Sequence, residues 1–270
     1  MDLVPDADER ELLLDHLARL IVAAGAETFS AAPYVEPTDR WFPDRWTGDA
    51  AAVERVLRRV LRYAGLGDLE LTLDIDRFSN PAGKVGEDGH PGGHEGAAAW
   101  FAGIHGGVCS FGVDVGQLGD PAGLVGVLAH EVGHAYRHVH DLRDPDRDLE
   151  ERLTDLTTVY LGFGILTANA SQRFRSGISG AGRSFYSRAQ SGYLSPQAMC
   201  FLLATSVTAR GESPRAIARH LSPNQKACFQ AACAALGPRD ALQARLGLPC
   251  ASPWAAAPRD RSWLGRLFGR

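Results

Sequence analysis

The chain has little lysine and no excess of basic charge. Lys84 and Lys226 are the only lysines among its 270 residues, so arginine supplies almost all of the positive charge. Its 28 basic side chains stand against 32 acidic ones, which gives a formal net charge of -4 at pH 7. Because proteins that bind nucleic acids favour a strong basic excess, this composition argues against a nucleic acid as the partner.

The sequence also lacks the marks of a secreted, redox-active or membrane-spanning protein. It has five cysteines, an odd number, and no CxxC pair, which predicts reduced thiols in the cytoplasm. The N-terminal segment is acidic ahead of its apolar run, whereas a signal peptide begins with basic residues. Asp15, His16 and Arg19 interrupt the apolar stretch over residues 12–24, so we expect a cytoplasmic protein without a transmembrane segment.

The bulk composition is that of a globular protein. Hydrophobic residues make up 45% of the chain and charged residues 22%, which is enough apolar material for a sizeable core. We predict an N-terminal helical region over residues 1–67, a main domain over 68–250, and a basic, aromatic tail over 251–270. Such a tail can contact a membrane or a partner protein, although terminal segments are also commonly disordered.

Hydrophobic periodicity predicts a mostly helical α+β fold with a small sheet. Apolar residues at helical spacing, or a Ser-Pro start, mark the segments predicted as helices: 8–25, 48–64, 149–169, 195–211, and two more that begin near residues 213 and 222. Alternating apolar and polar residues, or short apolar runs, predict strands over 69–76, 97–104 and 108–115, and the last two are expected to form a hairpin. The segments 26–47 and 80–96 are interpreted as irregular.

One segment carries the pattern HExxH, formed by His130, Glu131 and His134. On a helix both imidazoles lie on one face and can bind one metal ion, while Glu131 can take a proton from a metal-bound water. The pattern arises by chance in roughly one protein of this size in a hundred, and a surface helix with two incidental histidines is the simplest alternative. Apolar neighbours and the helix start at Asp120-Pro121 favour a buried helix, whose polar side chains need partners.

A third ligand would complete the site, and a downstream carboxylate is the first candidate. Glu151 is followed four residues later by Asp155, so both side chains face one way on a helix. Glu151 would bind the metal, and Asp155 would accept the spare ring N–H of a ligating histidine and fix its tautomer. Glu150 is a neighbouring candidate, but its spacing to Asp155 fits this arrangement less well.

His140 is the alternative third ligand, because it follows His134 by six residues, as in proteins with the pattern HExxHxxGxxH. In that pattern a glycine breaks the helix and brings the last histidine back to the metal. Arg137 stands at the glycine position here and favours continuation of the helix. We therefore favour Glu151 and interpret His138 and His140 as residues on the solvent side.

The sequence HEVGH followed by a helical ExxxD resembles the gluzincin branch of the zincin metallopeptidases. The resemblance covers about residues 97–165. The third-ligand helix of the prenyl-protein-processing zinc proteases is the nearest comparison, and this chain has Thr154-Asp155 where Ala-Asp is common there. The transmembrane helices of those enzymes have no counterpart in this sequence.

The resemblance implies a zincin-like fold in which the sheet packs beside the HExxH helix. It implies one Zn2+ ion held by His130, His134 and Glu151, with Glu131 as the base and proton shuttle and Asp155 as the support of a ligating histidine. The expected function is a zinc-dependent peptidase that acts on a peptide or protein substrate. A non-catalytic zinc-binding module with a regulatory or binding role is the alternative.

Other polar residues receive no firm assignment from the sequence. A tyrosine or histidine often stabilises the oxyanion in such enzymes, and Tyr186, Tyr193 and His105 are unranked candidates. His90 and His94 have the spacing of a ligand pair, but they fall in a glycine-rich segment. We interpret that segment as a loop near the cleft rather than as a second metal site.

Overall fold

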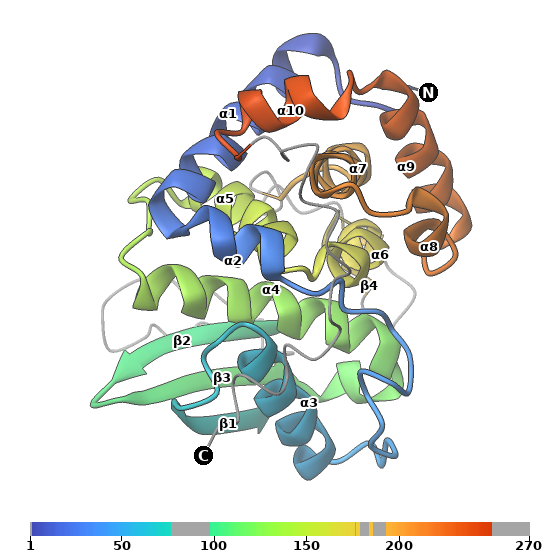
Figure 1. The fold of residues 1–270 in the computed structure, drawn as a ribbon. Helices are drawn as coiled ribbons and strands as arrows, with labels where there is room; N and C mark the ends of the chain where they lie inside the picture. Colours follow the sequence, from blue (N-terminus) through green and yellow to red (C-terminus); the bar gives the residue numbers. More distant parts are fainter. Residues whose placement is uncertain (1, 77–97, 176, 179–183, 186–192, 250–270) are drawn as a thin grey trace.

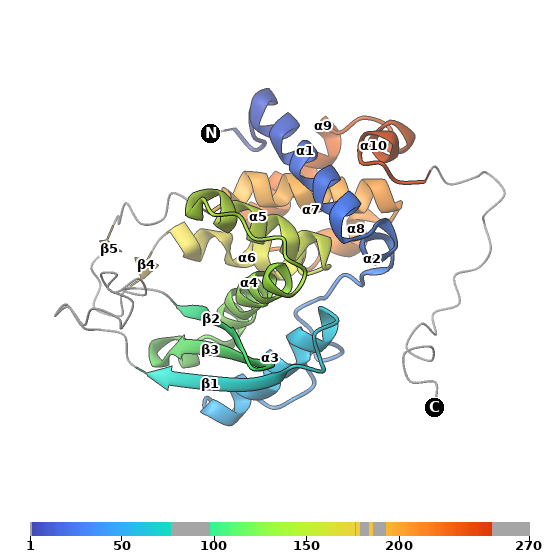
Figure 2. The ribbon, with the colours of Figure 1, turned by 90° about the vertical axis from the view of Figure 1, so that its left-hand side faces the viewer.

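The computed structural model describes residues 2–76, 98–175, 177–178, 184–185 and 193–249, and the architecture is the predicted α+β type. Helix α4 (Pro121–Val139) runs through the middle of the molecule. A three-stranded sheet and helix α3 (Ala50–Tyr63) lie on one side of α4, and the other helices lie on the opposite side (Figures 1 and 2). Both layers of the molecule therefore border α4.

The sheet has the strand order β1-β3-β2, which places β2 at an edge beside α4. Strands β2 (Ala99–His105) and β3 (Val108–Asp114) form the predicted antiparallel hairpin, and β1 (Glu70–Asp76) pairs with β3 in parallel. The register shifts between Phe101 and Gly103, so one extra residue bulges from β2. A bulge redirects the backbone groups next to it, and this one lies where β2 faces α4.

Helix α4 is capped at its N-terminus by Asp120 and has a largely apolar surface. The Asp120 carboxylate accepts a hydrogen bond from the backbone N–H of Gly123 at 3.1 Å, and Pro121 occupies the first turn. Most of the helix is buried, with Leu124 and Leu128 almost fully enclosed. Because buried polar groups are costly unless they are paired, the polar side chains of α4 need partners within the protein.

The remaining elements follow in chain order. They are α1 (Ala7–Ala24), α2 (Ala26–Ala31), the short 3-10 helix η1 (Val115–Gly119), α5 (Arg147–Tyr160), α6 (Gly164–Arg175), the two-residue strands β4 (Gly177–Ile178) and β5 (Ser184–Phe185), α7 (Pro196–Arg210), α8 (Pro214–Ala218), α9 (Pro223–Ala235) and α10 (Arg239–Arg245). The helices predicted over 8–25, 48–64 and 195–211 are confirmed as α1, α3 and α7, and those expected near 213 and 222 as α8 and α9. The seven-residue helix α10 was not predicted from the sequence.

The prediction of one helix over residues 149–169 is wrong, because the chain forms two helices there. Helix α5 ends at Tyr160 and α6 begins at Gly164. Between them Gly162 has a φ of 89°, a left-handed conformation that ends a helix and that residues with a Cβ rarely adopt. Its carbonyl oxygen accepts a hydrogen bond from the Val35 N–H at 3.0 Å. The break thus depends on a segment that lies far earlier in the chain.

Replacing Gly162 by alanine is expected to lower the free energy of unfolding by at least about 2 kcal/mol. A Cβ at this position would lie 1.9 Å from the carbonyl oxygen of Pro33, so a steric clash adds to the backbone strain. Gly65→Ala is the matched control, because Gly65 has a φ of +77° but nothing within 4 Å of its added Cβ. This control is expected to lose only about 1 kcal/mol. Urea unfolding measures both, and equal losses would show that the contact with Pro33 has no effect.

Residues 26–47 hold more regular structure than predicted, because Ala26–Ala31 form α2. The backbone N–H of Phe29 donates to the carbonyl oxygen of Gly25 at 3.3 Å. The Phe29 side chain is fully buried and stacks on Tyr160, with 5.9 Å between the ring centroids. A helix this short depends on packing rather than on its own sequence, which is why periodicity alone did not predict it.

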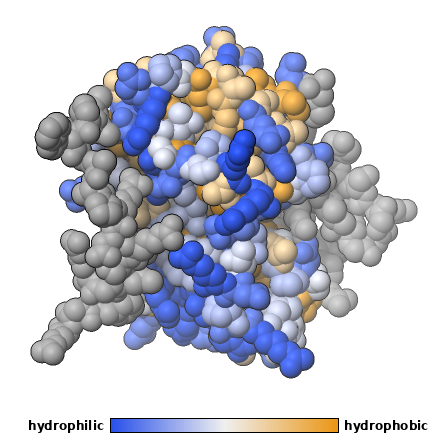
Figure 3. Space-filling model, turned by 45° about the vertical axis from the view of Figure 1, so that its right-hand side comes forward, coloured by the Kyte–Doolittle hydropathy of each residue, from blue (hydrophilic) through white to orange (hydrophobic). Residues whose placement is uncertain are grey.

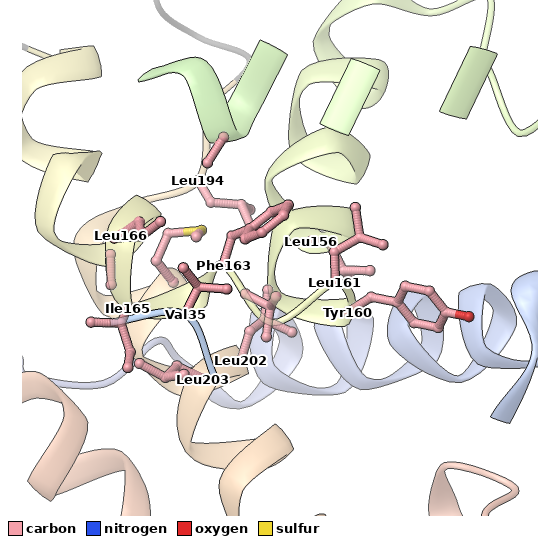
Figure 4. Close-up of a cluster of buried hydrophobic side chains, with 14 of the residues drawn as sticks. Val35, Leu156, Tyr160, Leu161, Phe163, Ile165, Leu166, Leu194, Leu202 and Leu203 are labelled. Atoms are coloured by element: carbon pink, nitrogen blue, oxygen red, sulfur yellow. The ribbon is translucent and has the colours of Figure 1, made fainter. Parts of the chain in front are cut away.

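One hydrophobic cluster extends through the described part of the chain. Figure 4 shows a portion of it, in which Val35, Phe163 and Leu203 come together from segments far apart in the sequence. The same cluster contains Leu17 and Leu57 from the first 67 residues. The predicted boundary at residue 67 therefore separates regions that share one core.

The described surface carries both hydrophilic and hydrophobic side chains. Hydrophilic side chains dominate the lower part of the face in Figure 3. The large hydrophobic residues that are exposed on the described part of the chain are Leu3, Leu12, Val22 and Val139. No described helix is long and apolar enough to cross a membrane. The tail over 251–270 lies outside the described residues.

Candidate metal centre

Helices α4 and α5 bring two histidines and one carboxylate together. His130 and His134 lie one turn apart on α4, with 4.9 Å between their ring centroids. Glu151 lies near the start of α5. One ligand atom from each of these three residues lies within 4.8 Å of the other two, and within the described residues this is the group of such side chains that could hold a metal ion. The sequence pattern predicted the same three residues as ligands.

The spacing of the three side chains fits a small divalent cation. The Oε2 atom of Glu151 lies 3.1 Å from Nε2 of His130 and 3.3 Å from Nε2 of His134. In a tetrahedral zinc site with bonds of about 2.0–2.2 Å, neighbouring ligand atoms lie about 3.3–3.6 Å apart. Imidazole nitrogen and carboxylate oxygen are also donors that zinc accepts. The donor set and its geometry therefore both suit a metal ion.

Asp155 holds the other nitrogen of His130. Its Oδ1 atom lies 2.9 Å from Nδ1 of His130, and its Oδ2 atom accepts a hydrogen bond from the Leu194 N–H at 2.8 Å. With Nδ1–H donating to Asp155, Nε2 of His130 carries the lone pair that would bind a metal. Burial by itself would lower the pKa of His130, but the hydrogen bonds to Asp155 and Glu151 outweigh it and raise that pKa.

His134 is supported differently, by a hydroxyl group that the sequence analysis did not identify. The Oγ1 atom of Thr154 lies 3.1 Å from Nδ1 of His134, and the nearest oxygen of Glu150 is 3.9 Å from the same nitrogen. Thr154 is fully buried. Its position three residues after Glu151 places it on the side of α5 that faces α4, so helical spacing was the signal that could have identified it.

Glu131 lies beside the ligand group and has its own partner from the sheet. Its Oε2 atom accepts a hydrogen bond from the backbone N–H of Phe101 on β2, at 2.7 Å. Only 5% of the residue is exposed, and burial raises the pKa of its carboxyl group above the ordinary value. The carboxylate is therefore held in a fixed position next to His130 and His134.

The pKa values of Glu151 and Glu131 are shifted in opposite directions. Burial would raise the pKa of Glu151, but hydrogen bonds with His130 and His134 outweigh it and lower that pKa well below the usual range. Glu151 is thus favoured as an anion, as a metal ligand must be. Two nearby carboxylates with pKa values shifted in opposite directions are typical of sites that assign them different roles.

The alternative third ligand lies elsewhere. His140 caps the C-terminal end of α4, is exposed, and lies against Tyr136 with 4.1 Å between the ring centroids. It is not part of the group formed by His130, His134 and Glu151. Helix α4 continues through Arg137, as its sequence predicted.

The structure describes two of the three candidates for stabilising an oxyanion, Tyr193 and His105. The Tyr193 ring lies against His130, with 5.1 Å between the centroids, and its phenol interacts with the Glu151 carboxylate. His105 is exposed at the end of β2. Tyr186 lies outside the described residues, as do His90 and His94 of the glycine-rich segment.

Comparisons of the chain with protein-family models, with curated proteins and with solved structures find no match. The site is accordingly interpreted from its own residues and geometry.

Proposed function

We propose that the chain is a zinc-dependent peptidase of the gluzincin type, which hydrolyses peptide bonds with water as the nucleophile. The observation that carries the proposal is the place of Glu131. A structural metal site has no use for a buried carboxylate beside its ligands, whereas peptide hydrolysis needs a base there. Three protein ligands, as His130, His134 and Glu151 would supply, are also typical of catalytic zinc sites, which keep a further position open.

The metal ion and the protein side chains would divide the chemistry between them. When bound, zinc supplies a Lewis acid that polarises a carbonyl oxygen and lowers the pKa of a water molecule. Glu131 accepts the proton from the attacking water and later donates it to the amine that leaves. The Phe101 N–H holds one oxygen of Glu131 throughout, and Asp155 holds the ring of His130 in the tautomer that binds metal.

The surroundings of Glu131 favour an extended peptide as the substrate. In the described part of the chain β2 pairs only with β3, and the Phe101 N–H on β2 is directed at Glu131. The second edge of β2 thus faces the candidate site, where an extended peptide can add by backbone hydrogen bonding. The Tyr193 ring lies against His130, and its hydroxyl group would donate to a carbonyl oxygen that becomes negatively charged.

Removal of the metal tests this function. Purified protein is expected to hydrolyse members of a mixed peptide library, to lose the activity after dialysis against a chelator, and to regain it with one equivalent of Zn2+. Products are identified by mass spectrometry, and metal content is measured at each step. Bound metal without cleavage of any peptide across several pH values would contradict the peptidase and favour a non-catalytic zinc-binding module.

A further inference from the structure

A buried ion pair connects the end of α4 to the start of α5, directly beside the candidate metal site. Arg137 lies three residues after His134, and Glu150 immediately precedes Glu151. The Nε atom of Arg137 donates to Oε1 of Glu150 at 2.9 Å, and its Nη2 atom donates to Oε2 at 2.8 Å. The two side chains are 3% and 14% exposed, so water competes little for either partner.

Further hydrogen bonds fix both members of this pair. Arg137 also donates to the carbonyl oxygen of Leu142 and, at 3.4 Å, to the hydroxyl oxygen of Thr157. Glu150 accepts one more hydrogen bond, from the backbone N–H of Asp144 at 2.8 Å. A two-bond contact between a planar guanidinium and a carboxylate fixes orientation as well as distance. The first turn of α5 is thereby held in one position against α4.

The residues that reach the histidines follow this turn along α5. Glu151 follows Glu150 directly and lies 3.3 Å from His134. Thr154, one turn further along α5, lies 3.1 Å from the other ring nitrogen of His134. Glu150 itself is held 3.9 Å from that nitrogen, since both of its oxygens are bound by Arg137.

We propose that Arg137 is a positioning residue for the metal site: by binding Glu150 it keeps that carboxylate away from the metal and places Glu151 and Thr154 against His134. The proposal rests on the metal site of the proposed function but not on hydrolysis itself. Arg137 thus has a defined role at the position where the alternative pattern HExxHxxGxxH has glycine.

The test measures metal binding by purified full-length variants that circular dichroism shows to be folded. Arg137→Met and Glu150→Gln are each expected to raise the Kd for Zn2+ roughly 10–100-fold, the range seen when the hydrogen-bonding supports of ligands are removed. The visible spectrum of the Co2+-loaded protein should change as well, because it reports the arrangement of the ligands. Arg152→Met is the matched control, since Arg152 lies on α5, as Glu150 does, but is 31% exposed and pairs with Glu9. Its Kd and spectrum should match those of the wild type.

The double variant Arg137→Met with Glu150→Met separates positioning from simple stabilisation. Replacing a buried ion pair by apolar side chains often restores stability. The proposal expects stability to return while the Kd for Zn2+ stays raised, and recovery of both would overturn it. If Arg137→Met does not fold, Arg137→Lys is measured instead, and a wild-type Kd and spectrum there would also overturn the proposal. Because no peptide is used, a protein that binds Zn2+ but cleaves nothing would contradict the peptidase and leave this inference standing.

Discussion

Glu131→Gln is expected to lower kcat for peptide hydrolysis about 10²–10⁴-fold while the protein keeps its metal. Glutamine has nearly the same shape and can still accept the hydrogen bond from the Phe101 N–H, so the fold and the ligands stay in place. It cannot take up a proton from water, however, and that range is typical of the loss of a general base. The measurement combines steady-state kinetics on a cleaved peptide with the zinc content of the same samples.

The control for this variant is Glu54→Gln, which removes a carboxylate from an exposed pair with Arg58 on α3. Its turnover and zinc content should equal those of the wild type. Unchanged turnover in Glu131→Gln would remove Glu131 from the mechanism. Loss of zinc from Glu131→Gln would show instead that Glu131 is a ligand.

The second large effect is expected at the third ligand. Glu151→Ala should weaken Zn2+ binding by more than the roughly 10–100-fold that loss of a ligand's hydrogen-bonding partner causes, because a metal–oxygen bond itself is lost. His140→Ala should leave the affinity unchanged, since His140 is exposed and lies against Tyr136 at the end of α4. Competition with a coloured zinc chelator gives the Kd of both variants.

The opposite result for these two variants would identify His140, and not Glu151, as the third ligand. If His140→Ala lost zinc and Glu151→Ala retained it, the third ligand would follow the HExxHxxGxxH arrangement. The unfolding midpoints of both variants are measured as well. They distinguish a general loss of stability from a specific loss of zinc binding.

The parts of the site that depend on local helical spacing could be predicted from the sequence. His130 and His134 lie on one face because they are four residues apart, and the same spacing relates Glu151 to Asp155. The Asp120-Pro121 start and the apolar neighbours predicted a buried helix, as α4 is. Spacing along a helix determines which side chains share a face. It does not determine which other part of the protein that face contacts.

The parts that depend on contacts between distant segments could not be predicted. The hydrogen bond from Phe101 to Glu131 requires the position of β2 beside α4, which no periodicity gives. Arg137 was expected only to continue the helix, yet it is buried because Glu150 reaches it from α5. The break at Gly162 likewise depends on Val35.

A crystal structure of the zinc-loaded protein tests whether His130, His134 and Glu151 hold one metal ion. Anomalous difference density at the zinc edge should show one ion about 2.0–2.2 Å from Nε2 of His130, Nε2 of His134 and a carboxylate oxygen of Glu151. Zinc bound without Glu151, or no ion between the two imidazoles in protein that carries one equivalent of zinc, would contradict the account.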